Sequence, residues 1–156
     1  AAAGGRGSRL LVRGFRPFGL LGGELGRDVY LSQQVPAVEA AWVVNAGKAG
    51  GGVMAPDFPA PYYFDRPWVV EGVHFRPPLA RWLAEADSAD ALLARFRERG
   101  LVTLVVPPRY GGGTRATLLP LADTPRGQAL VLELRRRLLL IETVNGFDVY
   151  RLPPAP

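Results

Sequence analysis

The chain has 156 residues, of which 48% are hydrophobic and 21% charged, so its length and composition predict one globular domain with a single core. It contains no cysteine, which excludes disulfides, thiolate catalysis and zinc-thiolate sites, and its one histidine, His74, excludes metal sites built from several histidines. The formal net charge is +5, and no apolar run approaches the roughly 20 residues that cross a bilayer.

The basic residues are almost all arginines. Only Lys48 among the 19 basic residues is a lysine, which leaves 18 arginines. An excess of positive charge suits nucleic acid or an anionic lipid surface, whereas arginine in place of lysine is also typical of GC-rich genomes. The arginines are scattered except at Arg135–Arg137, a run that fits either a solvated helix end stabilised by the helix dipole or a surface for lipid headgroups.

The two ends of the chain differ in composition from its middle. Residues 1–21 begin with small residues, glycine and arginine, without the apolar stretch of a signal peptide, and are expected to be a linker or the cut end of a longer chain, partly disordered. Residues 22–152 are predicted to form one α/β domain. Residues 153–156 begin with two prolines and are expected to be a tail.

The first half of the domain predicts one helix and one short strand. Pro36 opens a helix over residues 36–45, in which apolar side chains recur at helical spacing, and Gly47 ends it. After a glycine-rich link, residues 53–55 form a short apolar run bounded by Pro56, which predicts a buried strand.

The segment around Asp65 and Arg66 favours β-structure on both sides. Residues 62–64 and 67–70 are rich in aromatic and β-branched side chains, which are enriched in strands. We therefore expect a strand that turns or bulges at Asp65-Arg66 and then continues.

The next elements predict a helix-to-strand unit. Residues 79–86 repeat apolar side chains at spacings of three and four, and a second helix begins after the N-cap residue Ser88 and ends at Gly100. The strand over residues 101–106 is apolar throughout, which is typical of a strand covered by helices on both faces. This order predicts a sheet that is parallel at its centre.

The chain then predicts one more helix and a β-hairpin. Thr124-Pro125 opens a helix with a leucine and valine stripe, and Asn145-Gly146 separates two β-rich runs. Asn-Gly between such runs is the signature of a type I′ turn, because both central residues take positive φ. The predicted fold is therefore a three-layer, Rossmann-like α/β domain with a mainly parallel sheet and a C-terminal antiparallel hairpin.

No catalytic, cofactor or metal motif is evident. The two triple-glycine stretches lack the strand-glycine-helix order that directs helix amides at a phosphate. His74 stands near Asp65 and Glu71 and titrates near neutrality, but Gly-x-Ser-x-Gly is absent from the chain. We expect no cofactor and no metal, and a loop role for His74 is favoured over a catalytic one.

Asp65 and Arg66 allow two interpretations. In one, they form a binding site with Tyr62 and Tyr63, because aromatic faces stack on sugars and an arginine fork binds anions. In the other, Asp65-Arg66-Pro67 is a polar turn and the tyrosines fill a core with their hydroxyls at its rim.

Five stretches follow one another in a distinctive order: GRDVYLSQQVPAVEAAWVVNA, GGVMAP, PYYFDRPWVVEG, ADALLARFRERGLVTLVVPP and ELRRRLLLIETVNGFDVYRL. In this order the chain resembles, over about residues 22–152, the soluble C-terminal domain of bacterial GT-C membrane glycosyltransferases. These polytopic enzymes are related to protein O-mannosyltransferases and aminoarabinose transferases, and to sequences described as dolichyl-phosphate-mannose-like. The match is best at Tyr62 to Pro67 and in the closing hairpin.

The resemblance implies an accessory role on the extracytoplasmic face of the bacterial cell membrane. The domain would be tethered by transmembrane helices absent from this chain, with the membrane-embedded part of the same polypeptide as its partner. The enzyme would use a polyprenyl-phosphate-linked sugar, and this domain would not be catalytic by itself. Tyr62, Tyr63, Asp65 and Arg66 would then contact the acceptor or the lipid-linked sugar, and nucleic acid is not an expected partner.

Two other functions remain open from the residues. The arginine content and the α/β order also fit a stand-alone nucleotide- or nucleic-acid-binding module. A small hydrolase using Asp65, Glu71 and His74 is the weaker alternative.

Overall fold

The computed structural model describes residues 26–47, 50–71, 78–108, 118 and 122–154. The chain divides into two compact units, residues 1–35 and 36–156, and the boundary expected at residue 22 stays a prediction. The described part of the first unit contains the helix α2 (Arg27–Gln34). The sequence did not predict this helix, because its mean hydropathy is low and glycines precede it.

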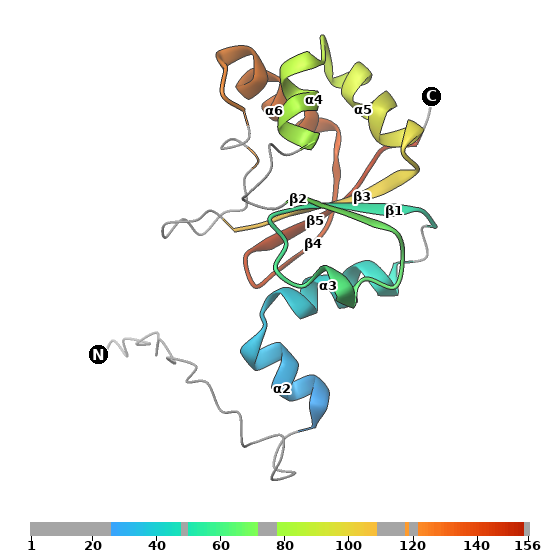
Figure 1. Cartoon of the computed structure of the whole chain (residues 1–156), viewed down its shortest axis with the longest axis vertical. Helices are drawn as coiled ribbons and strands as arrows, with labels where there is room; N and C mark the ends of the chain where they lie inside the picture. Colours follow the sequence, from blue (N-terminus) through green and yellow to red (C-terminus); the bar gives the residue numbers. More distant parts are fainter. Residues whose placement is uncertain (1–25, 48–49, 72–77, 109–117, 119–121, 155–156) are drawn as a thin grey trace, which may run out of the picture. The chain divides into compact units, whose positions relative to one another are not determined.

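The second unit is an α/β domain with a five-stranded mixed sheet (Figure 1). Its elements in chain order are α3 (Ala37–Ala46), β1 (Gly52–Pro56), the 3₁₀ helix η1 (Pro61–Tyr63), β2 (Trp68–Glu71), α4 (Pro78–Glu85), α5 (Ala89–Glu98), β3 (Leu101–Val106), α6 (Pro125–Arg137), β4 (Leu139–Val144) and β5 (Phe147–Arg151). The strand order is β2-β1-β3-β5-β4. The predicted α/β class is confirmed.

Parallel pairing is confined to one side of the sheet. β1 pairs in parallel with β2 and with β3, whereas β5 pairs antiparallel with both β3 and β4. The C-terminal hairpin supplies two antiparallel strands, so the sheet is mixed: it is parallel at the end formed by β2, β1 and β3 and antiparallel at the other end, and not mainly parallel with a parallel centre as predicted.

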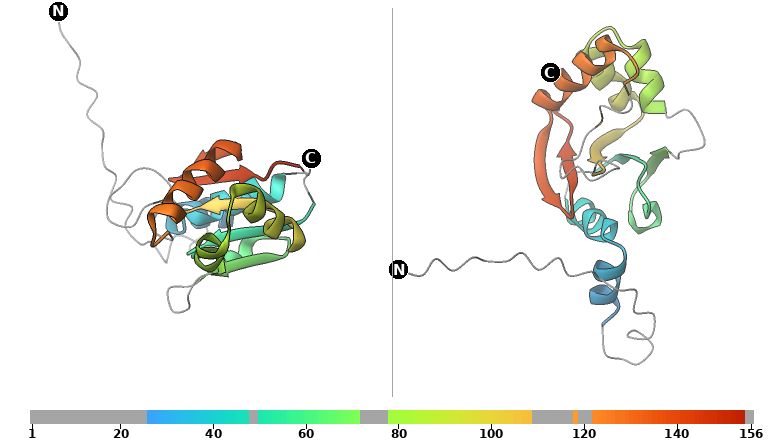
Figure 2. Two further views of the ribbon diagram at one scale, coloured as in Figure 1. Left: turned by 90° about the horizontal axis from the view of Figure 1, so that it is seen from above. Right: turned by 90° about the vertical axis from the view of Figure 1, so that its left-hand side faces the viewer.

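The sheet is packed on both faces (Figures 1 and 2). One core cluster joins α4, α5 and α6 to the sheet and includes Leu104 and Val106 of β3. Val105, between them, points to the opposite face, because neighbouring strand residues alternate, and it is fully buried as well. Helix α3 contacts β4 and β5 and lies on the side of the sheet away from α4–α6. Strand β3 is therefore buried on both faces, with Val102 partly exposed.

The closing hairpin has the predicted turn. Asn145 and Gly146 have φ of 49° and 83°, so both central residues take the left-handed conformation that a type I′ turn requires. The Asn145 side-chain amide also donates hydrogen bonds to the carbonyl oxygen of Pro36 (3.1 Å) and to Oε2 of Glu39 (2.6 Å). The turn is thereby attached to the beginning of α3.

The predicted helix starts are confirmed, but the predicted strand at residues 62–64 is wrong. Ser88 accepts a hydrogen bond from the Ala91 amide, and Thr124 accepts one from the Gly127 amide. Residues 61–63 instead form η1, with Pro61 in its first turn. Proline fixes φ near the helical value, and tertiary contacts outweigh the β-propensity of the aromatic residues that follow.

The close approach of Gly51, just before β1, to Val102 of β3 can be tested by substitution. Its φ is 114°, and a Cβ atom there would lie 2.7 Å from a methyl carbon of Val102. We expect Gly51→Ala to lower the free energy of unfolding by about 1–3 kcal/mol in urea titrations. Gly50→Ala is the matched control, because a Cβ at Gly50 meets nothing within 4 Å. An equal decrease in the free energy of unfolding of both variants would contradict the close contact between Gly51 and Val102.

Candidate functional site

The predicted site residues lie in the connection between β1 and β2. Tyr62 and Tyr63 belong to η1, and their rings are 4.9 Å apart at an angle of 46°. The exposed fraction of Tyr62 is 71%, whereas Tyr63 is half-buried. The structure therefore places an aromatic pair at the surface, on a short helix and not on a strand.

Asn45, in the last turn of α3, holds the residues that follow η1. Its side-chain amide donates a hydrogen bond to the Tyr63 carbonyl oxygen (2.8 Å), and its Oδ1 accepts one from the Asp65 backbone amide (3.1 Å). One side chain thus fixes the backbone on both sides of Phe64, whose ring stacks on Phe58 at 4.7 Å.

Arg66 closes the same connection onto the end of α3. Its Nη2 donates hydrogen bonds to the carbonyl oxygens of Gly47 (3.0 Å) and Asn45 (3.4 Å). Carbonyl groups at a helix C-terminus lack intrahelical partners, and a guanidinium group there also complements the helix dipole. Nε of Arg66 lies 3.4 Å from Oδ1 of Asp65. Arg66 is therefore largely engaged by the protein, and its side chain is only 14% exposed.

The four predicted residues thus divide into two roles. Tyr62, Tyr63 and Asp65 present polar and aromatic groups to solvent, and the Asp65 side chain is 61% exposed. Arg66 anchors the backbone that carries them. Asn45 was missed by the sequence, where it appeared only as one residue of a helical repeat, because its partners lie 18 and 20 residues further along the chain.

The carboxyl ends of the parallel strands are the usual ligand-binding edge of an open α/β sheet. Asp57 follows β1 there and has a φ of 50°, a left-handed conformation that Asp tolerates better than most residues. An aspartate directly after a buried strand can indicate a ligand-binding residue, and the sequence analysis did not single out Asp57. The residues after β2, His74 among them, lie outside the described residues, so the proposed grouping of His74 with Asp65 and Glu71 stays a prediction.

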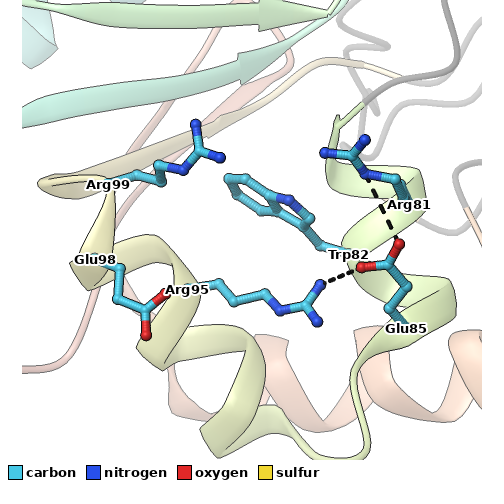
Figure 3. Close-up of a pocket in the computed structure, with 6 residues that line it drawn as sticks. All are labelled: Arg81, Trp82, Glu85, Arg95, Glu98 and Arg99. Atoms are coloured by element: carbon cyan, nitrogen blue, oxygen red, sulfur yellow. Dashed lines mark hydrogen bonds and ion pairs between the residues drawn. The ribbon is translucent and has the colours of Figure 1, made fainter.

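A second polar site lies between α4 and α5 (Figure 3). It is a half-open cavity of about 230 Å³, and its lining consists of Arg81, Trp82, Glu85, Arg95, Glu98 and Arg99. Glu85 pairs with Arg95 (2.7 Å) and lies 3.9 Å from Arg81. The guanidinium carbon of Arg99 lies 5.9 Å from the centre of the Trp82 ring, a cation–π contact. Three guanidinium groups against two carboxylates leave a net positive charge in this cavity.

The cavity suits a small anion better than an organic ligand. Its volume is below the range of roughly 300–1,000 Å³ typical of sites for drug-sized molecules, and the Trp82 side chain that forms its floor is almost fully buried. Trp82 packs edge-to-face on Phe96, with ring centres 5.6 Å apart. The tryptophan is therefore part of the core and offers no open face for stacking.

A polar network lies beneath α6. Asp148 of β5 accepts hydrogen bonds from the hydroxyls of Thr143 (2.7 Å) and Tyr150 (3.0 Å), and Nη2 of Arg135 approaches its Oδ2 at 3.7 Å. Burial raises the pKa of Tyr150, and the hydrogen bond to Asp148 and its negative charge raise it further, while Arg135 opposes them. The Asp148 carboxylate and the hydroxyls of Thr143 and Tyr150 satisfy one another, which is the pattern of a structural network.

Comparison with protein-family models, with curated proteins and with solved structures finds no match for this chain. The resemblance to membrane glycosyltransferases therefore stays a prediction. Within the described residues no helix has the length and apolar character to cross a membrane, and no three acidic or histidine side chains gather closely enough to hold a metal ion.

The anchoring role of Asn45 can be measured. We expect Asn45→Ala to lower the free energy of unfolding by about 1–2 kcal/mol, because two hydrogen bonds are lost and a carbonyl and an amide are left without their partner. Asp65→Ala is the control, because its exposed carboxylate contributes little. Equal stabilities of Asn45→Ala and the wild type in urea would contradict the anchoring role.

The raised pKa of Tyr150 predicts a pH-dependent stability. The fold favours the neutral phenol, so its contribution is fully present below pH 10, the ordinary tyrosine pKa, and is lost as the pH rises through the higher folded value. Tyr150→Phe loses a hydrogen bond and should be less stable by about 0.5–1.5 kcal/mol at neutral pH. Between neutral pH and about pH 11 this difference should shrink. A constant difference would show that Tyr150 has the same pKa in the folded and unfolded chains.

Proposed function

We propose that this chain is a non-catalytic accessory domain of a polytopic membrane glycosyltransferase that uses a polyprenyl-phosphate-linked sugar. In this proposal the domain lies on the extracytoplasmic face of the bacterial cell membrane and has the three-layer, Rossmann-like arrangement expected from its sequence. It positions the acceptor or the lipid-linked sugar for the membrane-embedded part of the same polypeptide.

The observation that carries the proposal is the exposed group formed by Tyr62, Tyr63 and Asp65. Tyrosine rings offer flat apolar faces against which the C–H faces of a sugar pack, and a carboxylate accepts hydrogen bonds from sugar hydroxyls. Asn45 holds the backbone at Tyr63 and Asp65, and Arg66 ties the same segment to the end of α3, so little backbone freedom is lost when a ligand binds.

A positioning role agrees with the chemistry of the described residues. Glycosyl transfer requires a general base or a carboxylate placed at the reacting sugar, and such groups usually have perturbed pKa values. Tyr150, whose pKa is raised by burial and by Asp148, is buried in its own network and is not part of the Tyr62 group. The role proposed for the Tyr62 group is binding of a sugar without a chemical step.

The test uses the complete membrane enzyme that the proposal requires, assayed with a polyprenyl-phosphate sugar. Tyr62→Ala combined with Tyr63→Ala should raise the KM for the sugar-bearing substrate by about tenfold, since each lost stacking contact is worth roughly 0.5–1.5 kcal/mol. The kcat should change by less than about twofold, because the tyrosines take no part in the chemistry. Tyr30→Ala in α2 is the control.

Three results would contradict the proposal. The first is sugar transfer by the isolated 156-residue chain. The second is a loss in kcat equal to the loss in kcat/KM in the double variant, which would indicate a role in the transition state. The third is salt-sensitive binding of nucleic acid in a filter titration, which would favour the nucleic-acid module instead.

A further inference from the structure

Large apolar side chains are exposed to solvent on β4 and on the outer side of α6. The exposed fractions are 51% for Leu132, 60% for Leu139, 49% for Leu140 and 42% for Ile141. Leu132 lies on the outer side of α6, and the other three begin β4, the last strand in the sheet order. An exposed apolar edge strand is a liability that proteins normally blunt, so its presence indicates a surface that is covered in use.

Arginines border these side chains on both faces of the sheet. Leu140 pairs with Tyr150, which belongs to the core beneath α6, so Leu140 lies on the α6 side, and Arg135 reaches Asp148 on that same side. Leu139 pairs with Arg151, which is exposed on the opposite side. We call the set Leu132, Arg135, Arg136, Leu139, Leu140, Ile141 and Arg151 the hairpin edge.

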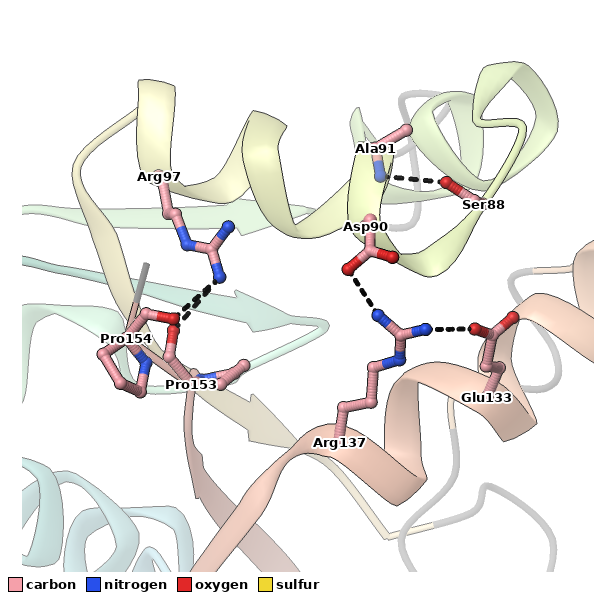
Figure 4. Close-up of polar contacts among 8 residues, drawn as sticks. All are labelled: Ser88, Asp90, Ala91, Arg97, Glu133, Arg137, Pro153 and Pro154. Atoms are coloured by element: carbon pink, nitrogen blue, oxygen red, sulfur yellow. Dashed lines mark hydrogen bonds and ion pairs between the residues drawn. The ribbon is translucent and has the colours of Figure 1, made fainter. Parts of the chain in front are cut away.

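Arg136 and Arg151 of the hairpin edge are available to a partner, whereas Arg135 lies 3.7 Å from Asp148. Arg136 follows Leu132 by one helical turn and is exposed, and neither Arg136 nor Arg151 forms an ion pair with a described residue. Arg137 differs, because it joins α5 to α6 through Asp90 and Glu133 and is used within the protein (Figure 4). In the run at Arg135–Arg137, Arg135 and Arg137 both form ion pairs within the protein, and Arg136 forms none with a described residue.

We propose that the hairpin edge docks on an anionic lipid bilayer. The leucines and Ile141 enter the boundary between headgroups and acyl chains, and Arg136 and Arg151 lie at the level of the lipid phosphates. Guanidinium groups bind phosphate oxygens bidentately, and the net charge of +5 adds attraction over a longer range. An anionic bilayer therefore offers contacts to both the apolar side chains and the arginines of the hairpin edge.

A second copy of the chain fits the same surface less well. Antiparallel pairing of two β4 edges by a two-fold axis would place the two sets of arginines at opposite ends of the joined strands, so it would use the apolar side chains and leave the arginines unused. The register of β4 also shifts between Leu140 and Glu142, so the strand carries a bulge at Ile141. Bulges interrupt the regular row of edge hydrogen-bonding groups that strand addition needs.

This inference does not depend on the proposed function, because the surface would dock on lipid whatever the domain does with a sugar. The experiment is co-sedimentation of the 156-residue chain with vesicles of phosphatidylcholine containing about 30% phosphatidylserine, against vesicles of phosphatidylcholine alone. We expect binding to the anionic vesicles that weakens as salt is added, and little binding to the neutral ones.

Two variants separate the apolar and charged contributions. Ile141→Ser combined with Leu139→Ser should weaken vesicle binding by tenfold or more, because two apolar side chains no longer enter the lipid. Arg136→Gln should weaken it by about fivefold, the value expected for one arginine near an anionic surface. The matched controls, Trp68→Ser on the opposite edge strand β2 and Arg81→Gln on α4, should bind as the wild type does.

The outcomes distinguish lipid from the other occupants. Arg136→Gln changes a solvent-exposed side chain on α6, so it keeps the test valid if the double serine variant fails to fold. Equal losses in Arg136→Gln and Arg81→Gln would overturn the proposal, because binding would then follow net charge and not this surface. The proposal would also be overturned if the chain did not bind anionic vesicles. If ultracentrifugation then showed a dimer that Leu139→Ser disrupts, the surface would be an interface between two copies of the chain.

Discussion

Burial of the sheet on both faces is the constraint on which the rest of the domain depends. Leu104 and Val106 of β3 enter the core beneath α4, α5 and α6, while Val105 is buried on the other face. A strand that is buried on both faces has no solvent-facing side that must stay polar. Helices α4–α6 cover one face of the sheet, and α3 contacts β4 and β5 on the other.

The candidate site follows from the end of α3. The chain passes from β1 to β2 over the last turn of that helix, whose carbonyl groups need partners. Arg66 supplies them, Asn45 binds the backbone next to it, and the two tyrosines of η1 are left facing solvent. A stabilising contact thus positions an exposed aromatic pair. The same principle explains why an arginine predicted to bind a ligand serves mainly the protein itself.

Local signals in the sequence predicted local structure well. Asn145-Gly146 identified the hairpin because the turn depends on two residues alone, and Ser88 and the apolar run at residues 101–106 identified a helix start and a two-sided strand for similar reasons. The strand predicted at residues 62–64 was wrong because Pro61 and the stacking of Phe64 on Phe58 override the local preference. These contacts cannot be read from a window of the sequence.

Contacts between residues far apart in the chain could not be predicted from the sequence either. The addition of the hairpin to β3 through β5, and the bonds from Asn45 and Arg66 across 18 to 21 residues, depend on the completed fold. The sequence left open whether Tyr62 and Tyr63 bind a ligand or fill a core, and the structure shows that Tyr62 is exposed and Tyr63 half-buried. The hydrogen bonds of Arg66 to the end of α3 could not be predicted, because they join residues 19 and 21 positions apart.

We propose that Tyr62, Tyr63 and Asp65 form a surface that binds a sugar. A two-dimensional NMR titration of the isolated chain with a short-chain prenyl phosphate sugar tests this binding. We expect chemical-shift changes in residues 61–66 and in the Asn45 side-chain amide, with the Trp82 indole unchanged. Changes confined to Trp82 and its surrounding arginines, or none at saturating ligand, would contradict this proposal.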